Sequence, residues 1–237
     1  MNLAALYSGG KDSTFAIYKA LQHNHEVSCL ITMLPAKPDS LFFHYPNAFL
    51  TTYQAECLGM PLISTKVQCR GQEEELLSLE QALKEAKETF AIDGIVSGGL
   101  SSRFQQKGFQ DVATKLGLQH YSPNWNADPV QYMYELLQNN FSIMIVGVSA
   151  AGLDENWLGR VIDNTTLEDL EVLSKRYGFN MAFEGGEAET FVLDCPLFKK
   201  RIEISNARKH WDGYRGYYEI LDAKVIDKQP SMNCSLQ

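Results

Sequence analysis

The chain has 237 residues, of which 45% are hydrophobic and 21% are charged. This composition is typical of a globular protein with one large domain or two smaller ones. We find no apolar run of the roughly 18 residues that a membrane-spanning helix needs. The N-terminus also lacks the basic and apolar regions of a cleavable secretion signal. We therefore expect a cytoplasmic protein with no membrane partner.

The net charge of −8 results from 21 basic and 29 acidic residues. An acidic chain of this kind argues against extensive contact with nucleic acid. The five cysteines are odd in number and form no CxxC pair, so we expect them to be reduced thiols. The sequence leaves assembly into a homo-oligomer open.

Strand and helix patterns alternate over the first half of the chain. The apolar and amphipathic patterns predict strands at 3–7, 26–34, 62–67 and 92–97, and helices at 14–21, 48–58, 72–90 and 101–116. Repeated strand–helix units are typical of a parallel sheet covered by helices on both faces. We therefore predict a Rossmann-like α/β domain over residues 1–125.

The pattern changes after this domain, where residues 122–129 are rich in turn formers and indicate a boundary. Beyond it we expect a helix to residue 139, a strand at 143–148, a helix at 166–177 and short strands to about residue 227. These elements predict a smaller α+β domain over residues 126–228. The polar residues 229–237 are expected to form a flexible tail.

The segment SGGKDS, residues 8–13, lies between the first expected strand and helix. Its glycines let the backbone approach a ligand, and the N–H groups at a helix start attract an anion such as phosphate. Ser8 and Ser13 add hydroxyl donors, and Asp12 is suited to hold a magnesium ion beside phosphates. The spacing is not that of the GxxxxGKS/T loop. A turn that merely caps a helix is the alternative, but the six positions together favour a nucleotide site.

The SGGKDS segment resembles the pyrophosphate loop of ATP pyrophosphatases, which cleave ATP between the α- and β-phosphates. In parallel sheets, ligands bind at the carboxyl ends of the strands. Thr32-Met33 lie near the end of one expected strand at that edge, and Gly98-Gly99 directly follow another. We expect all three segments to meet at one ATP, with the adenine near the Thr32-Met33 backbone.

Two further clusters follow in the second half. The segment GLDENWLGR, residues 152–160, brings acidic, aromatic and basic groups together, although a helix entry with a buried tryptophan has the same pattern. The segment EGGEAET, residues 184–190, places three carboxylates within six residues on a glycine-rich turn. Such carboxylates repel one another unless a cation lies among them. The alternative is an acidic turn exposed to solvent.

The three segments, in this order and spacing, resemble the diphthine–ammonia ligase family, an ATP-binding branch of the pyrophosphatase-loop enzymes. The resemblance runs from about Asn2 to Asp227. Pro123-Asn124-Trp125 matches a further family position, which is usually proline-leucine-tryptophan, so Asn124 is a departure.

The resemblance implies an ATP-dependent amide ligase with ATP and Mg²⁺ as cofactors. A carboxylate would be activated as an acyl-adenylate with release of pyrophosphate, and ammonia would then displace AMP. The implied acceptor is diphthine, the modified histidine of elongation factor 2.

The residues that the resemblance singles out fall into three groups. Catalytic roles are implied for Lys11, Asp12, Glu187 and Glu189, with Asp12 as the metal ligand. Nucleotide binding is implied for Ser8, Gly9, Gly10, Lys11, Asp12, Ser13, Met33 and Gly98. Substrate binding is implied for Trp125, Gly152, Asp154, Glu155, Trp157, Arg160, Glu184, Glu187, Glu189 and Thr190.

Aromatic faces and carboxylates suit the trimethylammonium group of diphthine, and the same carboxylates could bind ammonium or accept its proton. Every phosphate-binding feature lies in the first half. We therefore predict that the second half supplies the acceptor and ammonia sites, facing ATP across an interdomain cleft.

Three other functions share these features. Amidation of another carboxylate would use the same chemistry. A tRNA-modifying enzyme also carries this loop, but the acidic charge, the missing CxxC pair and the lack of an RNA-binding extension argue against it. A non-catalytic ATP-binding module is the third alternative, against which Lys11, Asp12 and the three glutamates argue.

Overall fold

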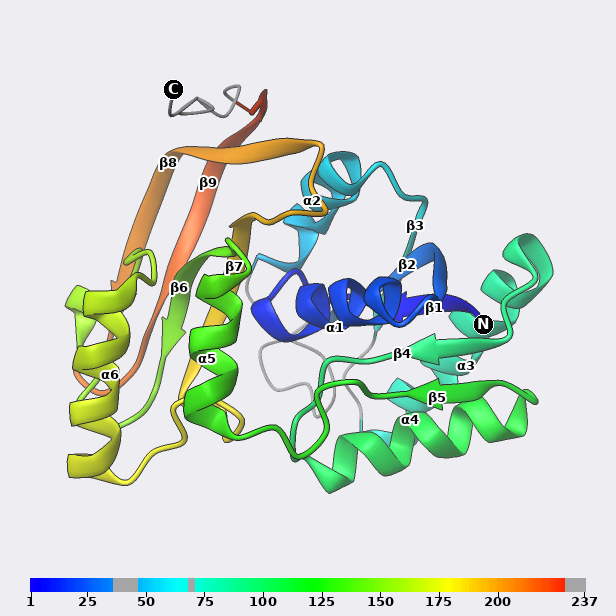
Figure 1. Ribbon diagram of the computed structural model, residues 1–237, viewed down its shortest axis with the longest axis horizontal. Helices are drawn as coiled ribbons and strands as arrows, with labels where there is room; N and C mark the ends of the chain where they lie inside the picture. Colours follow the sequence, from blue (N-terminus) through cyan, green and yellow to red (C-terminus); the bar gives the residue numbers. More distant parts are fainter. Residues whose placement is uncertain (36–46, 68–70, 229–237) are drawn as a thin grey trace, which may run out of the picture.

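Two β-sheets lie side by side in the computed structural model, which describes residues 1–35, 47–67 and 71–228 (Figure 1). The predicted tail at 229–237 lies outside the described residues. Among the described helices, none has the length and apolar character that a membrane crossing requires. The first sheet has five strands and the second has four.

The five-stranded sheet is parallel throughout and has the order β3-β2-β1-β4-β5. Its strands are β1 (Asn2–Leu6), β2 (Glu26–Pro35), β3 (Leu62–Val67), β4 (Gly94–Val96) and β5 (Gln119–Tyr121). The strand β5 was not predicted, because three residues of mixed polarity give no periodic signal. Since β1 is the central strand, the SGGKDS loop that follows it lies in the middle of the carboxyl edge.

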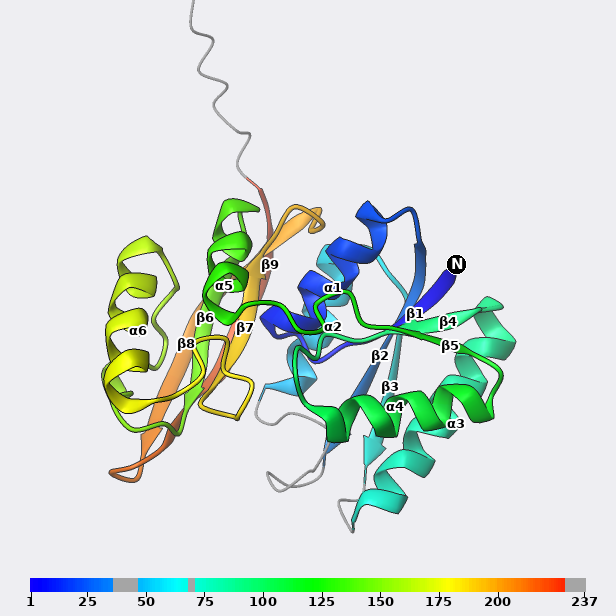
Figure 2. The ribbon, with the colours of Figure 1, turned by 60° about the horizontal axis from the view of Figure 1, so that its bottom comes forward.

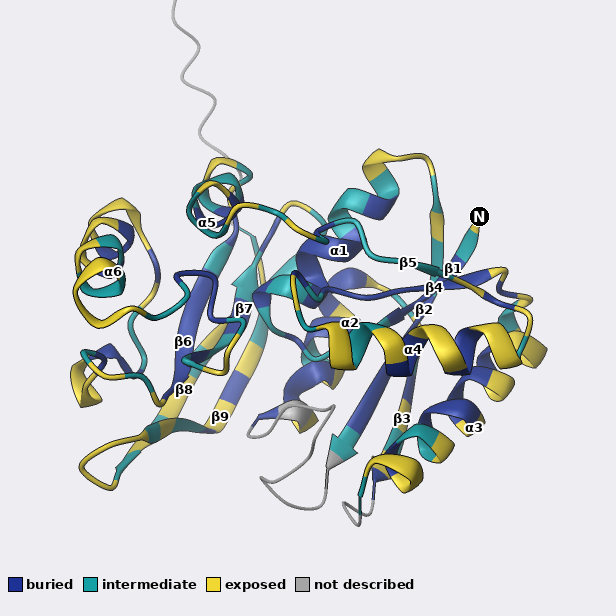
Figure 3. Ribbon diagram, turned by 90° about the horizontal axis from the view of Figure 1, so that it is seen from below, coloured by how far each residue is buried: buried dark blue, intermediate teal, exposed yellow. Residues whose placement is uncertain are grey.

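Helices cover both faces of this sheet, as predicted (Figure 2). They are α1 (Lys11–Gln22), α2 (Thr51–Leu58, after the short 3-10 helix η1, Ala48–Leu50), α3 (Gln72–Phe90) and α4 (Arg103–Lys115). Alternation along β1 explains the arrangement: Leu3 and Ala5 pack with α1 and α2, whereas Ala4 packs with α3 and α4. Helix α4 accordingly shows one buried and one exposed side (Figure 3).

The second sheet is antiparallel and has the order β7-β6-β9-β8. This half contains α5 (Pro129–Gln138), β6 (Ser142–Val148), the 3-10 helix η2 (Glu155–Trp157), α6 (Asn164–Tyr177), β7 (Ala188–Asp194), β8 (Lys200–Trp211) and β9 (Gly216–Asp227). The expectation of short strands was wrong for β8 and β9, which have 12 residues each. Register shifts around Asn206 interrupt the alternation of side chains, so the sequence pattern breaks where the hairpin continues.

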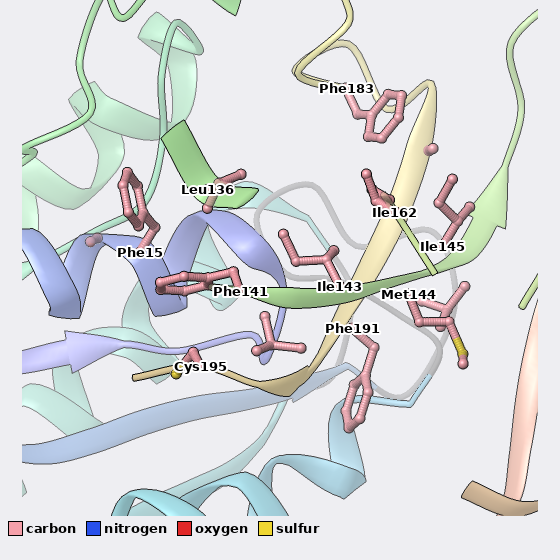
Figure 4. Close-up of a cluster of buried hydrophobic side chains, with 14 of the residues drawn as sticks. Phe15, Leu136, Phe141, Ile143, Met144, Ile145, Ile162, Phe183, Phe191 and Cys195 are labelled. Carbon is pink, nitrogen blue, oxygen red and sulfur yellow. The ribbon is translucent and has the colours of Figure 1, made fainter. Parts of the chain in front are cut away.

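The two sheets share one apolar core, in which Phe15 of α1 lies beside Leu136 and Phe141 of the second half (Figure 4). Phe15 of α1 is fully buried, and its ring lies 5.3 Å from that of Phe141 and 5.6 Å from that of Tyr132, both in the second half. Apolar side chains thus continue from β1 to β7. The division of the chain at residues 125 and 126 stays a prediction.

Replacement of Phe15 by alanine is expected to lower the free energy of unfolding by about 3–5 kcal/mol, since it removes a buried aromatic ring from this shared core. Urea denaturation monitored by circular dichroism measures the effect. Phe49→Ala, at a position that is 57% exposed, is the control and should change the free energy by less than about 0.5 kcal/mol. A loss of stability confined to one half, seen as two separate transitions, would contradict a shared core.

Candidate active site

The SGGKDS loop is preshaped for an anion. Helix α1 begins at Lys11, three residues before the predicted start, so half of the motif forms its first turn. Gly9 has φ of +80°, a conformation that glycine adopts without strain. No side chain among the described residues caps the helix at Gly10. The N–H groups of Asp12 and Ser13, in the first turn, lack partners within the helix and are therefore available to a phosphate.

Two hydroxyl groups complete this loop. The Ser8 and Ser13 oxygens lie 3.2 Å apart, and Ser13 Oγ accepts a hydrogen bond from Ser8 N–H. On the other side, Gly98 packs directly against the loop, because a Cβ at Gly98 would lie 2.4 Å from the carbonyl carbon of Asp12. The predicted approach of the Gly98 segment to the loop is confirmed by this contact.

Gln54 fixes the backbone of the loop from α2. Its side chain is fully buried, and Nε2 donates to the carbonyl oxygens of Gly9 at 2.8 Å and Val192 at 2.9 Å. The Gly9 oxygen also accepts from Val192 N–H at 3.0 Å. Strand β7 and helix α2 thus hold the same carbonyl group. Gln54 was not predicted as a site residue, because a lone glutamine in a helix belongs to no motif.

The end of the EGGEAET segment also touches the loop. Thr190 Oγ1 accepts a hydrogen bond from Lys11 N–H at 3.1 Å, and a Cβ at Gly10 would lie 3.2 Å from the Thr190 carbonyl oxygen. The expectation that this segment faces the loop across a cleft is therefore wrong for Thr190. Strand β7 begins within the EGGEAET segment and lies beside α1, so it forms one wall of the loop.

Asp12 and Lys11, both in the first turn of α1, form an ion pair with each other. The Lys11 side chain is 2% exposed, with Nζ 2.9 Å from Asp12 Oδ2 and 5.4 Å from the centre of the Phe183 ring. Tyr132 of α5 donates its hydroxyl hydrogen to Asp12 Oδ1 at 2.8 Å. Burial, followed by the charge of Asp12, raises the pKa of Tyr132 well above its usual value, so the phenol remains a donor.

Glu184 joins this group from the EGGEAET segment. Its Oε2 accepts hydrogen bonds from the N–H groups of Leu100 at 3.1 Å and Ser101 at 2.8 Å. Burial and then the charge of Asp12 raise the pKa of Glu184, whereas Lys11 lowers it. Glu184 therefore lies in the electrostatic field of the loop and ties the segment after β4 to it.

The other two glutamates have different surroundings. Glu187 accepts backbone hydrogen bonds from Asn180 at 3.0 Å and Gly185 at 2.7 Å, which hold its own turn together. Glu189 pairs with Gly147 across the sheet. Because side chains alternate along a strand, Glu189 lies on the face of β7 opposite to Thr190. The three carboxylates do not converge on one point.

The segment GLDENWLGR packs against α6 and the β8–β9 hairpin. Trp157 is 7% exposed, and the Arg160 guanidinium lies 4.7 Å above its ring while pairing with Asp169 at 2.8 Å. Gly152 lies against Tyr177 of α6. The ring of Trp157 is thus covered by a cation of the chain itself.

The polar residues of this segment remain at the surface. Asp154 and Glu155 are exposed, and Asp154 Oδ1 accepts from Asn156 N–H in a cap of η2. Met33 is buried among side chains of α3 and α4, and its contact with a nucleotide through the backbone stays a prediction. Trp125 lines a small pocket at the ends of β4 and β5.

A magnesium ion is compatible with the donor set at Asp12. Among the described residues, no group of three or more His, Cys, Asp or Glu side chains is arranged to hold a metal. Magnesium commonly takes one or two carboxylates and fills its remaining positions with phosphate oxygens and water. The Asp12 carboxylate is 30% exposed, and each of its oxygens keeps a lone pair beyond the bonds to Lys11 and Tyr132.

Comparisons with known proteins cover both halves of the chain. Residues 1–120 match the diphthamide synthase N-terminal domain, and residues 128–226 match the diphthamide synthase C-terminal domain. A solved structure described as a predicted subunit of tRNA methyltransferase, from Methanocaldococcus jannaschii, superposes with a TM-score of 0.43 and 15% identity. That superposition covers 83% of this chain and 98% of the other.

Curated relatives carry one name, diphthine–ammonia ligase. The Homo sapiens protein is 32% identical over 257 residues, which cover 98% of this chain and 95% of that protein. The Bos taurus protein is 32% identical over 227 residues, with 87% and 84% covered. These matches confirm the resemblance seen in the three motifs, and the chain belongs to the diphthamide synthase family.

Proposed function

We propose that this protein is an ATP-dependent carboxylate–ammonia ligase that converts diphthine to diphthamide on elongation factor 2. The observation that carries the proposal is the SGGKDS loop, whose open helix start is held by Gln54, Thr190 and Gly98. The names of the relatives, diphthine–ammonia ligase, supply the substrate class.

The proposed first step is attack of the acceptor carboxylate on the α-phosphorus of ATP. An oxygen–phosphorus bond forms to the carboxylate, the bond from the α-phosphorus to the bridging oxygen breaks, and pyrophosphate leaves. The N–H groups of the first turn of α1 and the hydroxyls of Ser8 and Ser13 would hold the leaving pyrophosphate. Because the loop is already shaped, these donors need little rearrangement during the reaction.

In the proposed second step, ammonia forms a bond to the acyl carbon and the carbon–oxygen bond to AMP breaks. The nitrogen loses its extra proton, and the products are the amide and AMP. Exclusion of water protects the acyl-adenylate from hydrolysis. The side chains of Lys11 and Tyr132 are buried beside Asp12, which is consistent with a site that excludes water around this carboxylate.

Asp12 would anchor magnesium, which supplies neutralisation of phosphate charge when bound. The residues of the chain set the orientation of this carboxylate. Tyr132 holds Oδ1 and Lys11 lies beside Oδ2, so the side chain is restrained from both ends. The charge of Lys11 offsets part of the negative charge of Asp12 and Glu184. A hydrogen bond from the Lys11 ammonium group to phosphate would require the Lys11 side chain to move.

Amidation of a different carboxylate remains the second candidate. The specific observation behind it is that Trp157, one expected partner of the trimethylammonium group, is covered by Arg160. ATP–pyrophosphate exchange in the presence of diphthine-bearing elongation factor 2 distinguishes the candidates. Exchange that depends on this acceptor supports the proposed substrate, and exchange that instead depends on RNA would support a tRNA enzyme.

Asp12→Asn is expected to lower AMP release by at least about 100-fold, the loss typical of one transition-state electrostatic contact. Tyr132→Phe should lower it only about fivefold, because one neutral hydrogen bond contributes about 1 kcal/mol. Steady-state assays of AMP and thermal unfolding of each variant measure the two effects. Near-normal turnover of Asp12→Asn would contradict its role.

Glu184→Gln and Glu187→Gln form a matched pair within one segment. We expect Glu184→Gln to lower amide formation at least tenfold, because the charge that balances Lys11 beside the loop is removed. Glu187→Gln should instead lower the free energy of unfolding by about 1–3 kcal/mol, since two backbone N–H groups lose a charged acceptor. Denaturation curves and product assays give both numbers. Equal effects of the two substitutions on activity and stability would refute the separation of roles.

A further inference from the structure

A small pocket lies at the carboxyl ends of β4 and β5, beside the start of α4. Its lining includes Ser97, Gly99, Ser122 and Trp125. Its cavity volume is about 10 Å³, close to the minimum for one water-sized molecule. Gly99 and Trp125 belong to segments expected at ATP and substrate, whereas Ser97 and Ser122 have no role in the site described above.

One wall of the pocket is a hydroxyl–imidazole cluster. Ser97 Oγ lies 2.7 Å from His120 Nε2 and 3.2 Å from Ser122 Oγ, which is itself 3.1 Å from the same nitrogen. Burial lowers the pKa of His120 to about 4, so the ring is neutral at neutral pH. When Nε2 is the acceptor, hydroxyl hydrogens of the serines are directed to the ring and to each other. The serine oxygens then keep lone pairs for a hydrogen-bond donor.

This pocket is separated from the SGGKDS loop by a single layer of chain. Gly98, between two lining residues, packs against the Asp12–Ser13 peptide. Asn124, between Ser122 and Trp125 in sequence, donates Nδ2 to the Asp12 carbonyl oxygen at 3.4 Å. Asn124 is 2% exposed, and among the described residues its Oδ1 has no hydrogen-bond partner. The layer therefore contains an acceptor that a donating ligand would satisfy.

The order of the strands places the pocket opposite the expected adenine position. The phosphates would lie at the end of β1, and the adenine is expected over β2 at Thr32-Met33. The pocket lies on the other side of β1, at β4 and β5. If the adenine lies at β2, the space at β4 and β5 is free for the reactants that approach the α-phosphate.

We propose that this pocket holds ammonia for the second step of the reaction, an assignment that rests on the proposed function. Ammonia is the size of water, donates hydrogen bonds to serine oxygens, and as ammonium is attracted by the face of an indole ring such as that of Trp125. Ammonium in the pocket first loses one proton to water, and the ammonia that leaves the pocket then forms the carbon–nitrogen bond to the acyl-adenylate with its nitrogen lone pair. The carbon–oxygen bond breaks with its electron pair on AMP, and the nitrogen releases one proton to water.

Alternatively, the Ser97–His120–Ser122 cluster serves only to hold β4 and β5 together. Two variants distinguish this structural role from a role in ammonia binding. Ser122→Ala removes one acceptor of the wall. Ser97→Ala removes the other serine oxygen of the wall, which lies 2.7 Å from His120 Nε2. Ser78→Ala on α3, whose hydroxyl donates to the Glu74 carbonyl oxygen, is the control.

The test measures two reactions of each full-length variant with diphthine-bearing elongation factor 2 at one fixed pH. ATP–pyrophosphate exchange reports the first step without ammonia, and amide formation at varied ammonium chloride gives the KM for ammonium. We expect exchange within twofold of the wild-type rate and a KM for ammonium raised at least tenfold in Ser122→Ala and Ser97→Ala. Ser78→Ala should change neither value.

Four results would overturn the assignment. An unchanged KM for ammonium in both variants shows that ammonia binds elsewhere, and a parallel rise in the KM for ATP assigns the pocket to the nucleotide. An equal loss of exchange and amide formation assigns it to structure. Wild-type protein that shows no exchange with this acceptor refutes the proposed function itself, and the ammonia pocket with it.

Discussion

The carbonyl group of Gly9 is the point on which the site depends. It accepts hydrogen bonds from the Gln54 side chain and from the Val192 backbone, so α2 and β7 both fix the turn after β1. A turn with a glycine at positive φ would otherwise sample many conformations, and an anion would have to order it on binding. Because Gln54 and Val192 lie 138 residues apart, the loop has its shape only when both sheets have assembled.

The same packing makes the charge of the site a shared property of the two halves. Lys11 and Asp12 come from the loop, Tyr132 from α5 and Glu184 from the turn before β7. Charges interact more strongly where water is excluded, and after burial the charge of Asp12 contributes to raising the pKa values of Tyr132 and Glu184. Lys11 is one cation beside two carboxylates, so it offsets part of the negative charge at this end of the loop.

The predicted site and the observed one differ mainly in the second half. Three carboxylates close in sequence were expected to act together, but Glu184 holds the segment after β4, Glu187 holds its own turn, and Glu189 lies on the opposite face of β7 from Thr190. Spacing in a turn does not determine the direction of side chains, since a single left-handed residue such as Phe183 or Gly186 redirects the chain. Gln54 and Tyr132 escaped prediction because their partners are distant in sequence.

The sequence by itself determined the parallel sheet, the helices on its two faces, the nucleotide-type loop and the family. These features depend on local periodicity, on glycine at a tight turn, and on motif residues that are neighbours along the chain. Only the tertiary structure decided that Thr190 forms a wall of the loop, that Arg160 covers Trp157, and that Ser97 meets His120 and Ser122 behind Gly98. The physical reason is that burial and hydrogen bonding between distant segments depend on how the two sheets pack, and no local pattern records that packing.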